Sequence, residues 1–140
     1  MMTTRKARQG GFTLVEVMVV AGMVAILAAI AYPSYTRYVQ NARQSDAQAE
    51  IMSLAGALER YRAKNFTYEG ATVANLAPDL ANSEFYTVTL SITGTGNQQY
   101  QISAAPKGGL MSGTDFMALD SEGRACKGAS SCTPSSSTHW

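Results

Sequence analysis

Histidine and cysteine, which often carry enzyme or metal chemistry, are nearly missing from this sequence. Histidine occurs once, as His139, and cysteine occurs twice, as Cys126 and Cys132. One histidine excludes a metal site built from two or three histidines, and two cysteines alone make a poor zinc site. A serine–histidine–aspartate triad would have to use the penultimate residue. We therefore expect no enzyme activity, no metal and no cofactor.

Charged residues are also few, at 15% of the chain, and the two signs nearly balance. Eleven basic residues against ten acidic ones give a formal net charge of +1. Three of the basic residues, Arg5, Lys6 and Arg8, precede residue 12, so the rest of the chain has 8 basic and 10 acidic residues and a net charge of −2. This balance gives no support for a general nucleic-acid binder.

What the chain does have is a long apolar run near its beginning. Between Phe12 and Tyr32 the only charged side chain is Glu16. As a helix this run would be about 31 Å long, enough to cross the hydrocarbon core of a bilayer. The basic cluster before it should stay cytoplasmic and place the C-terminal part outside. A secretory signal peptide and a plain signal-anchor are the alternatives. Two observations argue against a signal peptide: the run is longer than a usual signal core, and ILAAIAYP is only an imperfect cleavage motif.

Glu16 fits neither alternative, because a carboxylate inside a membrane span costs about 2.5 to 3.5 kcal/mol and so needs a partner or a function. If the chain is cut between Gly11 and Phe12, the new amino group lies four residues before Glu16, one helical turn away, where the two charges can pair. The dipole of the helix also favours an acid in its first turn. When subunits meet, Glu16 could instead neutralise the terminal amine of another chain.

The stretch GGFTLVEVMVVAGMVAILAAIAYPSY, together with the basic leader before it, resembles the N-terminus of type IV pilins and pseudopilins. The resemblance implies cleavage after Gly11 by a prepilin peptidase, N-methylation of Phe12 by the same enzyme, and recruitment of incoming subunits through Glu16. It implies storage in the bacterial inner membrane with a periplasmic domain, then assembly into an extracellular filament. The partners would be other pilin subunits, the peptidase and an inner-membrane assembly platform.

Gly22 and Pro33 interrupt the apolar helix. Glycine weakens a helix by about 1 kcal/mol relative to alanine, and proline removes a hydrogen bond and clashes with the preceding turn. We expect a kink near residues 29–33, although membrane helices often tolerate both residues. The resemblance further implies that the stretch between Gly22 and Pro33 loses helical order in the filament.

After Pro33 the pattern becomes amphipathic. Apolar residues recur at spacings of 4, 3, 4 and 3, which predicts one helix from about Phe12 to Lys64 whose second half packs on a sheet; these residues are Ala47, Ile51, Leu54, Leu58 and Tyr61. A coiled coil is the less favoured alternative, because the pattern covers barely two heptads. The segment from Asn65 to Gly70 ends the helix.

Alternating apolar and polar residues predict strands in the C-terminal half. The alternation over residues 86–93 and 100–104 predicts an antiparallel hairpin with its turn at Gly94–Asn97, and DFMALDSEGRAC predicts a third strand, a turn and a short fourth element. The expected fold class is α+β: a long N-terminal helix packed on three or four antiparallel strands, the pilin fold. The expected division is a leader (1–11), a membrane and filament-core helix (12–35) and a globular domain (36–140).

An even pair of cysteines close together in a small exported domain is typical of a disulfide. A Cys126–Cys132 bond would contribute only about 2.4 kcal/mol on the chain-entropy model, so it would pin the C-terminus. Its loop is shorter than the resembling family usually has, which weakens any surface role for it. The ending TPSSSTHW is expected to be a flexible or surface-lying tail.

The whole chain most resembles PilE-type minor pilins, which implies a fimbrial subunit for pilus assembly, twitching motility and cell adhesion. A major pilin and a type II secretion pseudopilin are alternatives within the same class. A DNA-binding competence pilin is a less favoured alternative from another class, in which Lys107, Arg124 and Lys127 gather on one face, because three basic residues without interleaved aromatics are usually a solvated surface.

Overall fold

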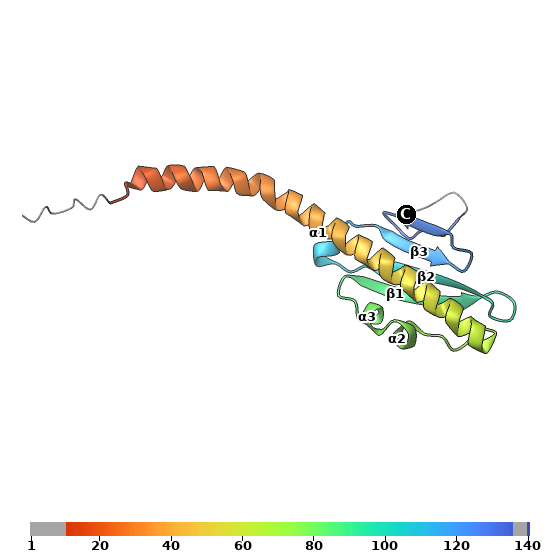
Figure 1. The fold of residues 1–140 in the computed structure, drawn as a ribbon. Coiled ribbons are helices and arrows are strands. Elements are labelled where there is room, and N and C mark those ends of the chain that lie inside the picture. The colour runs from red at the N-terminus through yellow and green to blue at the C-terminus, as the bar shows by residue number, and fades with distance from the viewer. Residues whose placement is uncertain (1–10, 136–139) are drawn as a thin grey trace, which may run out of the picture. The chain divides into compact units, whose positions relative to one another are not determined.

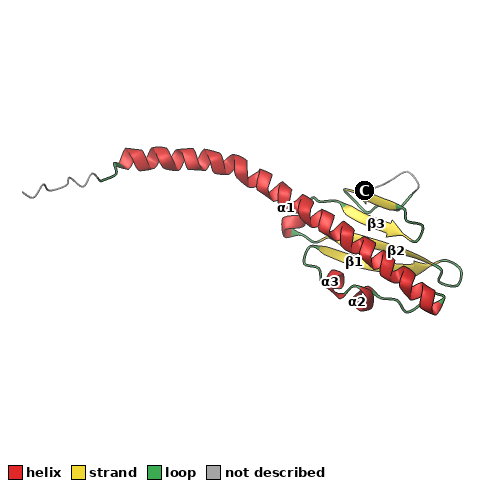
Figure 2. Ribbon diagram, viewed as in Figure 1, coloured by secondary structure: helices red, strands yellow, loops and turns green. Residues whose placement is uncertain are grey.

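A computed structural model describes residues 11–135 and residue 140. The chain divides into an N-terminal unit that ends at Arg37 and a second unit from Tyr38 to Trp140. Figures 1 and 2 show the elements of both units.

The N-terminal unit consists of the first part of helix α1, which runs from Leu14 to Asn65. The predicted helix was correct to within two residues at its start and one at its end. All side chains from residue 11 to residue 35 are exposed. The helix is long and apolar enough to cross a membrane, and none of its most apolar 18-residue window is buried.

In the second unit, α1 buries one stripe of its surface. Ile51, Leu54 and Leu58 have no solvent-exposed surface, and Ala47 is 5% exposed. Their spacing places them on a single helix face, as the sequence predicts. This stripe packs into a core with apolar residues of the sheet, including Ile102, and Figure 1 shows the C-terminal part of α1 lying over the strands.

The sheet is an antiparallel meander of four strands in the order β1-β2-β3-β4, which confirms the predicted α+β fold. Its register aligns Leu90 with Ile102 and Ile102 with Leu119, so that inward-facing side chains of three strands meet under the helix. Figure 2 shows the strands in yellow. The strands are β1 (Tyr86–Thr93), β2 (Gln99–Pro106), β3 (Phe116–Asp120) and β4 (Ala125–Gly128).

The β1–β2 turn lies where the sequence places it. The Asn97 amide donates to the Gly94 carbonyl over 3.2 Å. Gly94 has φ +80°, and a Cβ there would lie 3.0 Å from the side chain of Gln99. A residue with a side chain would therefore be strained at this position both in its backbone and against its neighbour.

Three short elements were not predicted. Helix α2 (Val73–Leu76), helix α3 (Pro78–Ala81) and the 3-10 helix η1 (Gly109–Met111) each complete about one turn. The Asn75 amide donates to the Thr72 hydroxyl at the start of α2 over 3.3 Å. Leu80 of α3 is 1% exposed, so these turns extend the core beside β1.

The C-terminal tail differs from the expectation. Pro134 is buried, and Trp140 packs against the core with part of its surface exposed. Residues 136–139 lie outside the described residues. The described part of the tail therefore belongs to the domain, because burying an indole ring removes a large apolar surface from water.

Leu54 provides a test of the α1–sheet packing. Replacing a fully buried leucine by alanine removes apolar contacts and leaves a cavity, so Leu54→Ala should lower the free energy of unfolding by about 2 to 5 kcal/mol. The measurement is urea unfolding of the full chain in detergent, followed by near-UV circular dichroism. Met52→Ala, at a side chain that is 58% exposed, is the control and should change stability by about 0.5 kcal/mol or less. Equal effects of the two variants would contradict the packing.

Buried tyrosines should make the domain sensitive to alkali. Burial raises the pKa of Tyr68, Tyr86 and Tyr100 above 10.0, and for Tyr100 the negative charge of Glu59 adds to the effect. A pKa raised in the folded state means that the unfolded chain loses its proton first, so stability is complete below about pH 10 and falls as pH rises above it. Each such tyrosine contributes a slope of up to about 1.4 kcal/mol per pH unit.

Tyr100→Phe should therefore make the fall in stability above about pH 10 less steep, by up to the slope that one tyrosine contributes. The measurement is the free energy of unfolding of the variant and the parent chain at several values between about pH 9 and about pH 12. The difference between the two chains at about pH 7 gives the packing effect alone. If the two slopes above about pH 10 are equal, Tyr100 does not destabilise the folded state by ionising.

Candidate functional site

The first turn of α1 holds the predicted assembly residue. Glu16 is the third residue of the helix, and its backbone amide donates to the hydroxyl of Thr13 over 3.3 Å. Thr13 is therefore the N-cap, and Thr13-Leu14-Val15-Glu16 matches the capping-box pattern of a serine or threonine followed three residues later by glutamate. The observed bond uses the backbone amide of Glu16, and no bond from its carboxylate to the Thr13 amide is seen within the described residues. This cap was not predicted, although the pattern is visible in the sequence.

Glu16 lies on an otherwise apolar side of the helix. A shallow exposed surface of the N-terminal unit is formed by Glu16 together with six apolar residues: Phe12, Val17, Val20, Ala21, Val24 and Ala25. Residues 16, 20 and 24 are four apart and therefore lie along one side of α1, and Phe12 lies just before its start. The carboxylate is thus the one charged group on a surface that suits lipid or another apolar helix.

The two residues predicted to interrupt the helix lie within it. Gly22 and Pro33 both fall inside α1, and residues 29–33 are helical. A Cβ at Gly22 would meet nothing within 4 Å, so no contact in the described residues requires a glycine there. The kink and the loss of helical order in a filament stay predictions. Gly11 and Phe12 precede the helix, and Phe12 is 84% exposed.

The two cysteines form the predicted disulfide. Cys126 lies in β4, the last strand of the sheet, and its Cα is 6.0 Å from that of Cys132. The bond ties the segment after β4 back to the edge of the sheet. The first cysteine lies in an edge strand, and the bond closes the short loop that the sequence predicts.

The three basic residues suggested for nucleic-acid binding each have another partner. Arg124 binds the carboxylate of Asp120 at 2.7 Å and that of Glu122 at 3.1 Å. Lys127 lies 3.7 Å from the Asp115 carboxylate. Because neighbouring acids neutralise these two cations, they form no positive face.

Lys107 is not part of such a face either. Its ammonium group donates to the backbone carbonyl of Ser83 over 2.6 Å, which holds the segment before β1 in place.

The end of α1 carries a different basic cluster, together with an exposed aromatic ring. Arg60, Arg62 and Lys64 are exposed and fall within five residues. Phe66 follows them with φ +61° and a side chain that is 82% exposed. A bulky residue in the left-handed region is strained, and glycine or asparagine is usual at this place after a helix. We call Arg60, Arg62, Lys64 and Phe66 the helix-end cluster.

Hydrogen bonds fix the helix-end cluster against the β1–β2 turn. Arg62 donates to the side-chain oxygen of Gln98 over 3.0 Å, and the Gln98 amide donates to the backbone carbonyl of Phe66 over 2.7 Å. The Arg62 guanidinium also lies 5.5 Å from the centre of the Tyr68 ring. Sequence reasoning missed this cluster, although RYRAKNF contains its signal, namely basic residues interleaved with aromatics.

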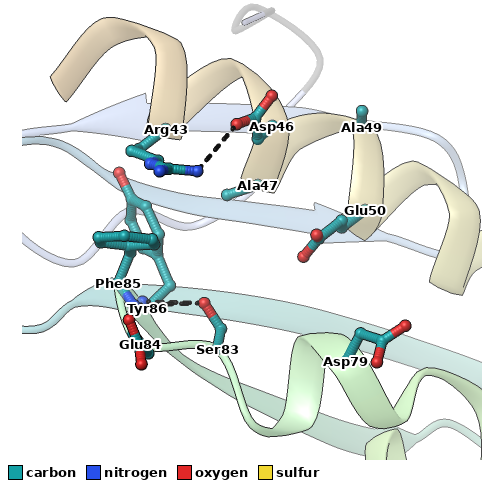
Figure 3. Close-up of a pocket in the computed structure, with 10 residues that line it drawn as sticks. All are labelled: Arg43, Asp46, Ala47, Ala49, Glu50, Asp79, Ser83, Glu84, Phe85 and Tyr86. Atoms are coloured by element: carbon teal, nitrogen blue, oxygen red, sulfur yellow. Dashed lines mark hydrogen bonds and ion pairs between the residues drawn. The ribbon is translucent and has the colours of Figure 1, made fainter. Parts of the chain in front are cut away.

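A groove of the second unit has the opposite charge (Figure 3). Its one basic side chain, Arg43, lies 3.7 Å from Asp46 and stacks over the Phe85 ring at 4.6 Å. The groove is about 430 Å³, and its other charged lining residues are acids: Glu50, Asp79 and Glu84. Four carboxylates against one guanidinium make this groove unsuitable for a polyanion.

Family models match almost the whole length of the chain. A model described as "Prokaryotic N-terminal methylation motif" matches residues 6–32, and a model described as "Type IV minor pilin ComP, DNA uptake sequence receptor" matches residues 33–127. The second match alone covers more than half of the 140 residues.

Curated relatives belong to both branches of the superfamily. The type II secretion system core protein G of Pseudomonas aeruginosa is 28% identical over 86% of this chain and 89% of its own length. A fimbrial protein of the same species is 32% identical over 68% of this chain and 60% of its own length. The type IV major pilin PilA of Myxococcus xanthus is 32% identical over 59% of this chain and 38% of its own length.

A solved structure shares the fold. The non-core minor pilin PilV of Neisseria meningitidis matches with a TM-score of 0.55 over 71% of this chain and 96% of that chain, at 17% identity. Both the sequence motifs and the arrangement of helix and sheet thus agree. The chain belongs to the family described as type IV minor pilin ComP, within the type IV pilins and pseudopilins, and it is a type IV pilin-like structural subunit.

Proposed function

We propose that the chain is a minor pilin that supports assembly of a type IV pilus and twitching motility. It would be made with residues 1–11 as leader, held in the inner membrane by residues 12–35, and carry residues 36–140 as a periplasmic domain until it enters an extracellular filament. The family description supports a minor role. The observation that carries the proposal is the lone carboxylate of Glu16 on an exposed apolar helix.

Maturation would create the partner that Glu16 needs. The N-terminal methylation model matches residues 6–32, which include the second half of the proposed leader and the first part of the helix. This supports cleavage after Gly11 and methylation of Phe12 by a prepilin peptidase. The new amine would lie next to the first turn of α1. In an apolar filament interior, leaving either charge unpaired would cost several kcal/mol, so the amine of one subunit and Glu16 of its neighbour would select the correct axial position.

The capping box offers a competing explanation of Glu16, and a single substitution separates the two. Glutamine serves in a capping box as glutamate does, but it carries no charge. Under the pairing hypothesis, Glu16→Gln should lower the amount of the chain in sheared pili by about tenfold or more, because a buried amine loses its counter-charge. Its amount in carbonate-washed membranes should stay the same or rise. Both fractions are measured by immunoblot.

Two variants control this experiment. Thr13→Ala removes the cap and keeps the charge, so under the pairing hypothesis it should incorporate far better than Glu16→Gln. Gly11→Val should block cleavage and give the background level for a chain without a free amine at Phe12. Normal incorporation of Glu16→Gln would refute pairing, and poor incorporation of Thr13→Ala alone would favour the cap.

A second candidate function is DNA binding, through the helix-end cluster. Two observations favour it: the family description names a DNA uptake sequence receptor, and the cluster combines three exposed basic residues with an exposed aromatic ring. Basic side chains neutralise phosphates, while an aromatic face stacks on a splayed base. The second unit as a whole has 7 basic and 9 acidic residues, so binding would rest on this local cluster.

This candidate predicts a strand-binding site that depends on salt. The full chain in nonionic detergent should raise the fluorescence anisotropy of a labelled single-stranded oligonucleotide at low salt. Phe66→Ala should weaken binding by about 5-fold to 100-fold, the value of one stacked base. The double variant Arg60→Gln/Lys64→Gln should reduce the slope of log K against log salt by about 1 to 2.

Lys107→Gln and Lys127→Gln are the controls, because their ammonium groups already have partners. They should leave affinity and salt slope as in the parent chain. No detectable binding at low salt would refute DNA binding. Equal losses of affinity in the control variants would show that the helix-end cluster is not the binding site.

A further inference from the structure

We propose that Tyr32 and Tyr35 form an anchor for the lipid headgroup layer and set the depth of the chain in the membrane before assembly. The proposal rests on the membrane-inserted state of the proposed function but not on pairing, minor-pilin status or DNA binding. It concerns the N-terminal unit alone. Its partner is the outer interface of a phospholipid bilayer.

Exposure and spacing first mark the two residues as one patch of the N-terminal unit; Tyr38, which is 73% exposed, follows the charged Arg37 and belongs to the second unit. Tyr32 is 76% exposed and Tyr35 is 69% exposed, although each ring has a large apolar surface. Residues three apart on a helix are neighbours on its surface, so the two rings form one patch. Neither hydroxyl has a hydrogen-bond partner within residues 11–135 or at residue 140. The patch therefore lacks both apolar cover and a polar partner.

The position of the patch along the helix fits the edge of a bilayer. The hydrocarbon core is about 30 Å thick, with a further polar layer on each side. At about 1.5 Å per residue, Tyr32 lies about 27 Å and Tyr35 about 32 Å beyond Leu14, the first helical residue. With Leu14 near the inner boundary, the two rings lie on either side of the outer boundary.

The neighbouring polar residues do not mark this boundary themselves. The Ser34 hydroxyl donates to the Ile30 carbonyl over 3.2 Å, and the Thr36 hydroxyl donates to the Tyr32 carbonyl over 3.0 Å. Both hydroxyls are satisfied within the helix and make no demand on water. The first charged side chain after Glu16 is Arg37. The tyrosine hydroxyls are thus the first polar groups of the span that need an outside partner.

Tyrosine has the chemistry that this boundary requires. Its ring is apolar and prefers the acyl chains, and its hydroxyl can bind headgroup phosphates, ester carbonyls or water. Tyrosine and tryptophan are enriched at both membrane interfaces for this reason. The alternative occupant is the helix of a neighbouring pilin, but the patch continues directly from an apolar span that already suits lipid. We therefore assign it to the lipid interface.

Depth can be measured with the full chain in phosphatidylcholine vesicles. Trp140→Phe removes the one native tryptophan, and Ile26→Trp then reports depth at a position about 18 Å beyond Leu14. Quenching by lipids brominated near the chain end is compared with quenching by lipids brominated near the headgroup. Tyr32→Ser/Tyr35→Ser should draw the helix toward the outer water and lower the ratio of deep to shallow quenching by about twofold.

Met52→Ser is the matched control, since Met52 is exposed on the part of α1 that packs on the sheet. It should leave the ratio unchanged. An unchanged ratio in the double tyrosine variant would overturn the anchor. If that variant also failed to enter pili, the patch would be a contact between subunits and not a lipid anchor. If neither lipid quenches the introduced indole in the parent reporter, the chain is not inserted, and the membrane step of the proposed function fails as well.

Glu16→Gln in the same reporter chain keeps the two hypotheses apart. Pairing and depth are independent under our proposal, so this variant should have the parent ratio in vesicles whatever its amount in pili. A ratio that falls as far as in the tyrosine variant would assign depth to Glu16 and overturn the anchor.

Discussion

The structure depends on one continuous helix, α1, whose two parts present different surfaces. Because its hydrogen bonds lie within the helix, the backbone of α1 needs no partner from lipid, from another subunit or from the sheet. The side chains alone therefore decide which environment each part takes. Up to residue 35 every described side chain is exposed, whereas Ile51, Leu54 and Leu58 are fully buried. The sheet in turn needs this stripe, since α1 supplies the long apolar surface that covers its inner face.

The large elements could be predicted because each carries its own periodicity. The spacing of the buried α1 residues, the alternation in β1 and β2 and the glycines between them each indicate one structure without reference to the rest of the chain. The short helices α2 and α3 carry no such pattern, because four residues complete barely one turn. A capping hydroxyl and the burial of Leu80 hold them instead. The packing of Trp140 was not predicted either, because no local pattern indicates it and its contacts come from the folded core.

The sequence singles out a candidate residue where the chemistry is local, but it does not show charge pairs that form only in the fold. Glu16 could be singled out because a charge in an apolar run is visible in the sequence itself. The ion pair of Arg124 could not be predicted in this way, because the turn between β3 and β4 brings its partner Asp120 next to it. Lys127 likewise meets Asp115 only once those strands have paired. Counting basic residues overestimates a positive face whenever such acids lie nearby.

The energetics of Glu16 show why an N-cap does not remove its need for a partner. A charged carboxylate in a membrane span costs about 2.5 to 3.5 kcal/mol. The dipole of the helix returns about 0.3 to 1 kcal/mol, and up to about 2 in a favourable geometry. Thr13 stabilises the start of the helix through the Glu16 amide, which does nothing for the carboxylate charge itself. A cost of about 0.5 to 3 kcal/mol remains. In the proposed function, a neighbouring ammonium group would offset it. Under the proposed pairing, the helix dipole lowers the cost of the acid in the membrane, and the remaining cost would favour the step in which subunits meet.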